Sequence, residues 1–443
     1  MNLNYTSSQK NGYLRTRPFS VLWGFEAMNY TKLKGMVDLL PKESLLWKKL
    51  SHKIEDFFEK AGFLYIETPY LEKTELFARS TGKETEVVQK QMYSFLDKNE
   101  ESITLRPEAT ASVVRAYVEN KIYGQKSVEK YYYFGPMFRY EKPQKGRQRQ
   151  FFQYGVEIIG TADAKADAEV ISLVWHLYKK LNIQFNLKLN SIGCSQCKTV
   201  YREKLSGFLK NKMLSLCEDC QRRATKNPLR VFDCKNETCQ KNIAGAPLVL
   251  DYICEACRGD FKKVQAYLKN ENIDFEVDPK VVRGLDYYTK TAFEFISGAL
   301  GAKDALCGGG RYDNLVESLG GPSTPAVGFS GGMERLILAV QSSGLPAGEN
   351  ESLASVFFVT LGDEAEKQGL KIANELRNKS VRCLIGYDQK SIKAQMRLAN
   401  KEEAQFVCIL GENELKLGKV SVKNMKTGDQ EEVALQKLAE YFL

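Results

Sequence analysis

Residues 131–160 place an arginine, an aromatic ring, an amide and a carboxylate where they could hold a charged ligand. Two aromatic-rich apolar runs flank a basic connector, residues 141–149, which predicts two antiparallel strands joined by an exposed loop. Successive side chains of a strand point to opposite faces, so Phe151, Gln153 and Glu157 share one face of the second strand. An amide and a carboxylate make a poor core wall, and we expect this face to be the floor of a ligand site.

Three arginines indicate that the ligand carries phosphate. Arg139 ends the first strand on the same face, and Arg283 and Arg335 stand beside glycines in VVRGLDYY and GGMERLIL. One such arginine is usually a surface residue, but three fixed, permanently charged forks suit a nucleoside triphosphate. The sequence contains neither a G-x-x-x-x-G-K-[ST] loop nor a dinucleotide-binding turn, so ATP would be held in another way.

The cysteines are concentrated in one part of the chain. Of the 11 cysteines, eight form close pairs, namely Cys194 and Cys197, Cys217 and Cys220, Cys234 and Cys239, and Cys254 and Cys257. In a reducing compartment such pairs suggest metal before disulfides, and two tetrahedral zinc sites could be built from them. The same spacing fits buried free thiols, because separation along the chain does not establish convergence in space.

Length and composition favour a multidomain enzyme. A chain of 443 residues is too long for a single ordinary core, and a hydrophobic content of 43% can build two or three. The net charge of +9 is compatible with a polyanionic partner. No apolar run approaches the roughly 20 residues that span a bilayer, and the N-terminus lacks a signal-type apolar stretch, so we expect a cytoplasmic location and no membrane contact.

The first half of the chain predicts a mixed α+β unit, residues 28–183. Helical periodicity runs through residues 42–60 and 166–181, and residues 62–73 predict a strand that ends at Pro69. Residues 105–117 predict a strand end, a turn and a helix with polar residues at its start. Residues 1–27 are polar and aperiodic, which indicates a disordered extension or sequence upstream of a translation start at Met28.

The second half changes character three times. Residues 184–278 predict an inserted Cys-rich helical domain, and residues 279–340 return to strands, beginning with KVVRGLDYYTKTAFEF. Residues 341–352 have the composition of a linker. Residues 353–443 alternate short apolar strands with helical runs, which predicts a small α/β domain with a parallel sheet.

Several motifs resemble those of a known family. Residues 138–160, FRYEKPQKGRQRQFFQYGVEIIG, resemble the second signature motif of class II aminoacyl-tRNA synthetases, and GFSGGMERL and GFLYIETPYLEK resemble the third and the first. RGLDYYTKTAFEF and GGGRYDNL resemble the histidine motifs of the histidyl-tRNA synthetase family. The resemblance implies a class II antiparallel β-sheet core with flanking helices, an inserted helical domain, a C-terminal α/β anticodon-binding domain, and a homodimer built at the first motif.

The resemblance also implies an activity and a set of site residues. The enzyme would activate L-histidine with ATP and Mg²⁺ to histidyl-adenylate, release pyrophosphate, and transfer histidine to the 3′ end of tRNA(His). The histidine-binding residues would be Glu108, Thr110, Gln153, Glu157, Arg283, Tyr288 and Tyr312. The ATP-binding residues would be Arg139, Phe151, Arg283 and Arg335, with Arg139 and Arg283 acting on the α-phosphate as catalytic residues.

The basic connector has two readings. It could be a solubilising loop, but its place beside a phosphate site favours contact with a tRNA acceptor stem. In the family this loop approaches the first base pair of tRNA(His), which implies contacts from Gln144, Arg147 and Arg149.

Two other functions compete with this one. A non-catalytic, synthetase-like regulatory subunit of ATP phosphoribosyltransferase resembles the core but lacks the anticodon-binding domain and the full arginine set. A class II synthetase for another amino acid is disfavoured by RGLDYY. Both alternatives predict no histidine-dependent adenylate formation.

Overall fold

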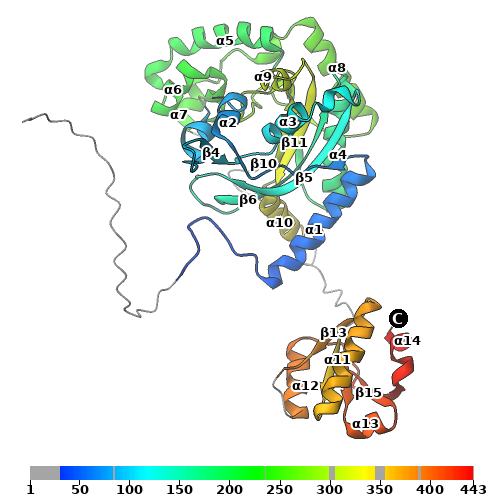
Figure 1. Ribbon diagram of the computed structural model, residues 1–443. Coiled ribbons are helices and arrows are strands. Elements are labelled where there is room, and N and C mark those ends of the chain that lie inside the picture. Colours follow the sequence, from blue (N-terminus) through cyan, green and yellow to red (C-terminus); the bar gives the residue numbers. More distant parts are fainter. Residues whose placement is uncertain are drawn as a thin grey trace, which may run out of the picture.

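The structure is a computed structural model that describes residues 30–82, 85–234, 236–298, 305–344, 355–387 and 391–442. The predicted extension, residues 1–27, and most of the predicted linker, residues 341–352, lie outside these ranges. Figure 1 shows two separate units, a large one that ends with helix α10 and a smaller C-terminal one.

An eight-stranded sheet forms the centre of the large unit. In spatial order its strands are β1 (Leu64–Tyr65), β5 (Glu129–Phe138), β6 (Gln150–Ile159), β11 (Ala326–Gly332), β10 (Ala305–Arg311), β9 (Thr289–Ile296), β7 (Asn186–Ser191) and β8 (Glu276–Val277). The pairs from β5 to β7 are all antiparallel, and only the short end strands β1 and β8 pair in parallel. The predicted α+β class with an antiparallel core sheet is confirmed.

The two faces of β6 are used differently, as the alternation predicts. Tyr154, Val156 and Ile158 belong to a core that also contains apolar residues of α1 (Pro41–Lys60), α4 (Ala164–Lys180) and α10 (Met333–Ser342). The opposite face of the sheet packs in part against α3 (Thr110–Glu119), whose Val113, Val114 and Tyr117 join Tyr131, Tyr133 and Met137 of β5 in a second core. The polar residues of β6 lie on this second face.

The predicted strand at residues 62–73 is wrong in its extent. The structure has only β1 (Leu64–Tyr65), and after Pro69 the chain enters β2 (Leu71–Lys73), which belongs to a separate sheet with β3 (Tyr93–Leu96) and β4 (Ser102–Leu105). Proline lacks the amide hydrogen that a continuous ladder needs, so the two strands pair with different partners.

The strand predicted at KVVRGLDYYTKTAFEF is also shorter than expected. It begins only at Thr289, and residues 278–288 form a loop. Side chains of β7 and of the cysteine-rich segment hydrogen-bond to this loop, so it does not extend the strand ladder. A pattern of apolar residues alone does not show which groups hydrogen-bond to the backbone N–H and C=O groups of a segment.

The cysteine-rich segment is helical, as predicted. It contains α5 (Ser195–Lys210), η3 (Met213–Ser215), α6 (Glu218–Lys226), η4 (Pro228–Asp233), α7 (Glu237–Asn242), η5 (Val249–Asp251) and the start of α8 (Glu255–Asn270). We call residues 194–257 the cysteine module, because the buried residues of its own core run from Cys197 to Cys257. Strand β7 and the rest of α8 belong to the large unit, since Leu187, Leu189, Phe261, Val264 and Leu268 lie in its core.

The C-terminal unit has the predicted β-α-β-α-β order. Strand β12 (Ser355–Thr360) pairs in parallel with β13 (Arg382–Ile385) and β14 (Phe406–Leu410), and β15 (Lys419–Asn424) and β16 (Gln430–Ala434) extend the sheet antiparallel. Helices α11 (Asp363–Asn378) and α12 (Ile392–Lys401) bury residues in two different cores of this unit. In the described parts of the chain no helix is long and apolar enough to cross a membrane.

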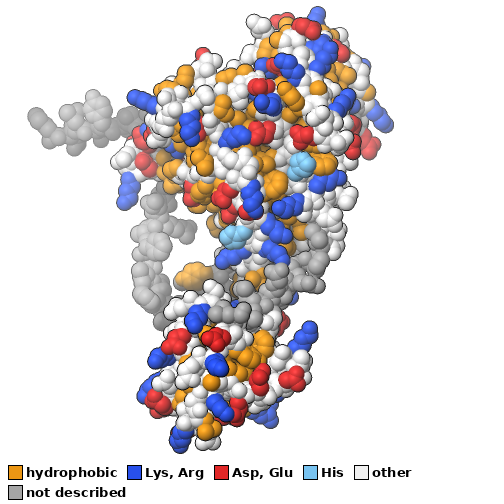
Figure 2. Space-filling model, turned by 90° about the vertical axis from the view of Figure 1, so that its right-hand side faces the viewer, with side chains coloured by type: hydrophobic (Ala, Val, Ile, Leu, Met, Phe, Trp, Pro, Cys, Tyr) orange, Lys and Arg blue, Asp and Glu red, His pale blue; other side chains and the backbone are white. Residues whose placement is uncertain are grey.

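The outer surface is mixed in charge. In Figure 2, basic and acidic side chains alternate over the visible face, with apolar side chains between them. The two histidines of the chain, His52 and His176, are among these surface residues, with 77% and 51% of their side chains exposed. Neither lines the pocket described below.

Candidate active site

The floor of the candidate site is the polar face of β6. Glycines on the neighbouring strand β11 keep this floor open, because Gly328 pairs with Glu157 and Gly332 with Gln153. A Cβ at Gly328 would lie 1.7 Å from Oε2 of Glu157. The floor opens into a pocket of about 340 Å³, lined among others by Glu108, Phe151 and Gln153.

Glu157 is a buried carboxyl group surrounded by hydroxyls. Its Oε1 accepts hydrogen bonds from Thr110 Oγ1 at 2.7 Å and from the Tyr133 hydroxyl at 3.3 Å, and its Oε2 accepts one from the Tyr312 hydroxyl at 2.5 Å. Burial raises its pKa to about 8, although these hydroxyls act in the opposite direction. The site therefore holds a carboxyl group that is ready to meet a further N–H donor.

Glu108 and Gln153 both line the pocket, but of these two only the carboxylate of Glu108 has hydrogen-bond partners for its oxygens among the described residues. Glu108 accepts the backbone N–H groups of Thr110 and Ala111 at 2.8 and 2.9 Å at the start of α3, and burial raises its pKa. Gln153 is also buried, and its Oε1 has no hydrogen-bond partner within the described ranges. A buried amide oxygen without a partner is costly, and a ligand with a positive N–H group would satisfy it.

The three predicted arginines all line this one pocket. Arg139 donates from Nε to the carbonyl oxygen of Pro107 at 2.8 Å, and its guanidinium lies 5.2 Å from the centre of the Phe151 ring. Arg283 pairs with Glu294 at 2.5 Å and stands over the Tyr288 ring at 5.5 Å. Five N–H groups on each arginine give this pocket a concentration of donors suited to phosphate oxygens.

Arg335 lines the pocket from the first turn of α10. It donates from Nε to the carbonyl oxygen of Gly146 at 3.2 Å and from a terminal nitrogen to that of Ala305. Burial and the neighbouring charge of Arg147 lower its pKa to about 10. It remains charged near neutral pH, and an anionic ligand would relieve this repulsion.

The basic connector folds back as a tight turn between β5 and β6. Gln144 pairs with Arg147 across the turn, Arg147 forms an ion pair with Glu141 at 3.0 Å, and Arg149 lies 3.7 Å from the centre of the Tyr140 ring. Of the three predicted tRNA contacts, only Arg147 lines the pocket. Gln144 is exposed at the turn, outside the pocket lining.

Two tyrosines of the site were missed by sequence reasoning. Tyr133 on β5 lies opposite Gly155 on β6, and the register of this strand pair could have shown that Tyr133 faces the site. Tyr287 donates to Glu108 at 3.4 Å, and its ring lies 4.6 Å from that of Tyr288. It belongs to a loop, where no periodicity indicates which of two adjacent tyrosines faces the ligand.

The structure brings the eight clustered cysteines together as two groups of four. We call Cys194, Cys197, Cys254 and Cys257 the neck cluster, and Cys217, Cys220, Cys234 and Cys239 the distal cluster. Within each cluster all four sulfur atoms lie within 4.8 Å of one another. The neck cluster joins the first and last pairs along the chain, a combination that spacing alone does not specify.

Comparison with known proteins agrees with this geometry. Residues 35–336 match the family model described as histidyl-tRNA synthetase, and residues 355–443 match an anticodon binding domain. The Histidine--tRNA ligase of Desulfitobacterium hafniense is 47% identical over 92% of this chain and 96% of its own length. That of Halothermothrix orenii is also 47% identical, over 92% and 97%.

Solved structures agree as well. The apo histidyl-tRNA synthetase of S. aureus superposes with a TM-score of 0.79 and 37% identity over 93% of this chain and 99% of that one. An ATP phosphoribosyltransferase regulatory subunit/histidyl-tRNA synthetase from Bacillus halodurans shares the fold at 20% identity, with a TM-score of 0.61 over 87% of this chain and 99% of that one. The family match covers the catalytic part with its three arginines, and an anticodon binding domain follows it, which favours a synthetase over a non-catalytic regulatory subunit. The chain therefore belongs to the histidyl-tRNA synthetase family.

Proposed function

We propose that this chain ligates L-histidine to tRNA(His) in two steps at the pocket above β6. Histidine is first activated with ATP to histidyl-adenylate, with release of pyrophosphate, and is then transferred to the 3′ end of the tRNA. The observation that carries the proposal is the buried Glu157 carboxyl group beside the unpaired amide oxygen of Gln153. One suits an imidazole N–H and the other suits an α-ammonium group, so the floor fits both ends of free histidine.

The imidazole end is assigned to Glu157, Tyr288 and Tyr312. Glu157 and Tyr312 are hydrogen-bonded to each other beneath the pocket lining, and Tyr288 belongs to that lining. Glu157 would accept a ring N–H, and the two tyrosines would enclose the ring. Buried polar groups that pair with a ligand N–H are left unpaired by an analogue without it, which costs factors of about ten thousand in comparable sites. The α-amino end is assigned to Glu108, Thr110 and Gln153, since Gln153 has a free acceptor and Glu108 lies beside it in the pocket.

The ATP end is assigned to the arginines and Phe151. Arg139 and Arg283 would bind the α-phosphate from two sides while the histidine carboxylate attacks it in line, and they would stabilise the charge on its oxygens. Arg283 would also contact the histidine carboxylate. Phe151 and Arg335 would enclose the adenine ring. The reaction needs no protein nucleophile, because the bound histidine is itself the attacking group.

Class II synthetases use ATP with Mg²⁺, and the pocket offers a fitting carboxylate. Glu294 lies in the pocket beside Arg283 and is partly exposed there, so it would hold the ion. Mg²⁺ takes one or two protein carboxylates together with phosphate oxygens and water, and when bound it neutralises and orients the phosphates. Glu294 would also keep Arg283 in place until ATP arrives.

Transfer RNA is assigned two contacts. Gln144, Arg147 and Arg149 in the connector would meet the acceptor stem, which is supported by the position of Arg147 in the pocket wall. The C-terminal unit would bind the anticodon, as its match to an anticodon binding domain supports. The terminal ribose hydroxyl of the tRNA would then attack the acyl carbon of the adenylate.

A homodimer is supported by the edge of the large sheet. Leu64 and Tyr65 on β1 are 58% and 50% exposed, and Leu71 and Phe95 on the adjoining small sheet are 45% and 48% exposed. Large apolar side chains collected at a sheet edge mark an interaction surface. We propose that a second copy of the chain covers them.

The domain division follows the same reasoning. We propose a catalytic core in residues 28–183 and 279–340, an inserted domain in residues 184–278, a linker in residues 341–352, and an anticodon-binding domain in residues 353–443. The eight cysteines of the two clusters are proposed to bind two structural Zn²⁺ ions, with buried free thiols as the alternative. Eleven free cysteines suit the reducing cytoplasm, where we propose that the protein acts.

The test is histidine-dependent exchange of pyrophosphate into ATP, followed by charging of tRNA(His). We expect exchange with histidine alone among the amino acids and charging of tRNA(His). Proline and threonine serve as control substrates. Exchange driven by either of them, or histidine binding without any exchange, would contradict the proposal, and the second result would favour a regulatory subunit.

A further inference from the structure

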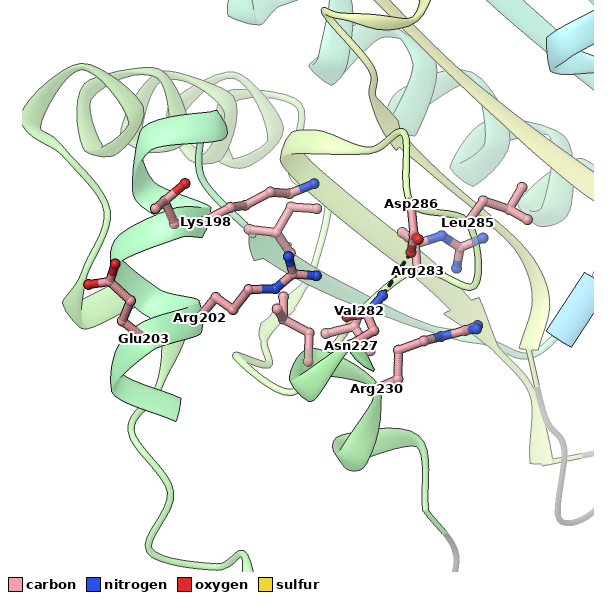
Figure 3. A pocket seen from close by; sticks show the side chains of 12 residues that line it. Lys198, Arg202, Glu203, Asn227, Arg230, Val282, Arg283, Leu285 and Asp286 are labelled. Carbon is pink, nitrogen blue, oxygen red and sulfur yellow. Dashed lines mark hydrogen bonds between the residues drawn. The ribbon is translucent and has the colours of Figure 1, made fainter. Parts of the chain in front are cut away.

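The loop formed by residues 278–288 separates the active-site pocket from a second cavity. It carries Arg283, Tyr287 and Tyr288 of the site. Behind it lies a cavity of about 410 Å³, lined by this loop and by the α5 and η4 parts of the cysteine module. Figure 3 shows Lys198 and Arg202 extending from α5 toward the loop, and Arg283 lines both hollows. Anything that moves this loop changes the histidine site.

Three side chains of the cysteine module hold the loop. Asn227 donates to Asp286 Oδ1 at 2.8 Å, which Figure 3 marks with a dashed line. Arg230 donates to the carbonyl oxygen of Gly284 at 2.9 Å, and the Lys198 ammonium donates to that of Tyr288. Strand β7 holds the start of the loop, because the Asn190 side chain donates to the carbonyl oxygens of Pro279 and Val281 at 3.2 and 2.8 Å. The module supplies side-chain partners to the later part, from Gly284 to Tyr288.

Each of these donors stands beside a cysteine cluster. Lys198 directly follows Cys197 of the neck cluster in the first turn of α5. Asn227 and Arg230 lie between Cys220 and Cys234 of the distal cluster, at the end of α6 and within η4. The position of the donors therefore depends on whatever fixes the two clusters.

The clusters have the dimensions of tetrahedral thiolate sites. A tetrahedron with Zn–S bonds of about 2.3 Å has sulfur–sulfur edges of about 3.8 Å. In the neck cluster the sulfur atoms of Cys194 and Cys197 are 3.6 Å apart, and those of Cys197 and Cys257 are 4.0 Å apart. In the distal cluster the corresponding distance between Cys217 and Cys234 is 3.9 Å.

Backbone donors support the charge of the sulfur atoms. The amide of Cys254 donates to Cys197 Sγ at 3.0 Å, and the amide of Cys217 donates to Cys239 Sγ at 3.2 Å. Such N–H groups stabilise thiolate ligands around a metal. Most of these cysteines are also members of the module's own core, beside apolar residues such as Tyr201, Leu205 and Val231, so a metal in each cluster would tie the short helices together within this core.

We propose that Zn²⁺ in both clusters sets the conformation of the loop at residues 278–288, and through it the affinity for histidine. Lys198, Asn227 and Arg230 act as positioning residues that carry the effect from the clusters to the loop. The inference rests on the proposed function, because histidine is the ligand whose affinity reports the loop. It assigns the cysteine module a part in amino-acid binding through Lys198 and Asn227, which do not line the active-site pocket, and through Arg230, which does.

The first test breaks the connection while keeping the metal. In the double variant Asn227→Ala/Arg230→Ala we expect two equivalents of zinc, as in the wild type, and a KM for histidine raised about tenfold in pyrophosphate exchange, with a smaller change in kcat. Asn227→Ala alone, which keeps the pocket-lining Arg230, should raise the KM in the same direction, and a wild-type KM there would also overturn the proposal. Asn227→Ala/Arg230→Lys should have a lower KM than the double alanine variant, since a cation can still reach Gly284. Arg222→Ala, which removes an ion pair with Asp219 within α6, is the matched control and should behave as wild type. A wild-type KM in the double variant would overturn the proposal.

The second test removes the metal. We expect metal analysis of the purified protein to find two equivalents of zinc, falling to one in Cys239→Ala and in Cys254→Ala, each with weaker histidine binding by calorimetry. Cys383→Ala, a buried cysteine outside both clusters, should keep two equivalents and normal affinity. Protein without zinc, or cluster variants with normal affinity, would overturn the inference. Failure of the proposed function gives a different result from failure of this inference. The wild-type protein would then bind zinc but show no histidine-dependent pyrophosphate exchange.

Discussion

At the scale of single residues, Glu157 is the group on which the proposed amino-acid site depends. It is 1% exposed and accepts three hydroxyl donors, yet burial still raises its pKa to about 8. Burial makes the charged form of this carboxyl group unfavourable while it lacks a further partner. An N–H donor that approaches it would stabilise the charged form. In the proposed site this donor is an imidazole N–H of histidine.

Glu157→Gln should weaken histidine binding by at least tenfold. The amide keeps the shape of the side chain, but a hydrogen bond to a charged group is worth about 1.5–3 kcal/mol and a neutral one is worth less. Calorimetric titration with histidine measures the change. Glu169→Gln, which alters a carboxylate paired with Lys130 away from the active-site pocket, is the control. Equal affinity in Glu157→Gln and the wild type would show that the imidazole binds elsewhere.

The same variant has a second readout in its pH dependence. Because the pKa of Glu157 is raised from the ordinary 4.5 to about 8, the folded protein binds more protons than the unfolded chain between these values. The free energy of unfolding therefore falls as pH rises through this window. Thermal unfolding without ligand should show a smaller loss between pH 6 and pH 8 in Glu157→Gln than in the wild type.

At the scale of elements, the site depends on the register between β6 and β11. Register places Gly328 beside Glu157 and Gly332 beside Gln153, so the neighbouring strand leaves room above each functional side chain. The faces of β5 and β6 could be predicted from alternation, which assigned Arg139, Phe151, Gln153 and Glu157 to one face of the sheet.

Other parts of the site could not be predicted by the same means. Tyr287 lies on a loop, and the boundary at Thr289 depends on side chains far away in the sequence, so periodicity carried no signal for either. The pairing of the four cysteine pairs into two clusters likewise depends on tertiary structure. The periodicity of apolar residues predicts the strand faces and the helices. The conformation of the loop at residues 278–288 depends instead on contacts between residues far apart in the sequence.

Gly328→Ala tests the role of the register. The new Cβ would stand 1.7 Å from Glu157 Oε2 and 2.5 Å from the carbonyl oxygen of Val156, so the carboxyl group must be displaced. We expect a loss of about 1–3 kcal/mol in the free energy of unfolding and a loss of measurable histidine binding. Denaturant titration and calorimetry check the two. Gly245→Ala adds a methyl group where nothing lies within 4 Å and should change neither. Normal histidine binding by Gly328→Ala would contradict the proposed floor.

At the scale of the whole molecule, the two units have separate cores. The three buried clusters of the large unit contain no described residue beyond Val340, and the two of the C-terminal unit contain none before Val356. The proposed chemistry of adenylate formation lies entirely in the large unit. In the proposed function, recognition of tRNA is divided between the connector and the C-terminal unit.

A chain ending at residue 344 should therefore separate the two half-reactions. We expect histidine-dependent pyrophosphate exchange within about threefold of the full chain, and charging of tRNA(His) reduced by at least a hundredfold, since one of two tRNA contacts is lost. Exchange and charging assays on the same preparation check this, with thermal unfolding to verify that the shortened chain is folded. Normal charging would contradict the proposed role of the C-terminal unit.

The path of the chain at the neck cluster has one more consequence. The chain leaves the large sheet after β7 at Cys194 and returns to the core of the large unit through α8, which begins just after Cys254. Exit and re-entry lie side by side, because their sulfur atoms belong to one cluster. The intervening residues can therefore be lengthened, shortened or exchanged without stretching the catalytic sheet. An insertion of about sixty residues could therefore be accepted by this fold, and its sequence could later change, with structural adjustment needed only at the junction formed by the neck cluster.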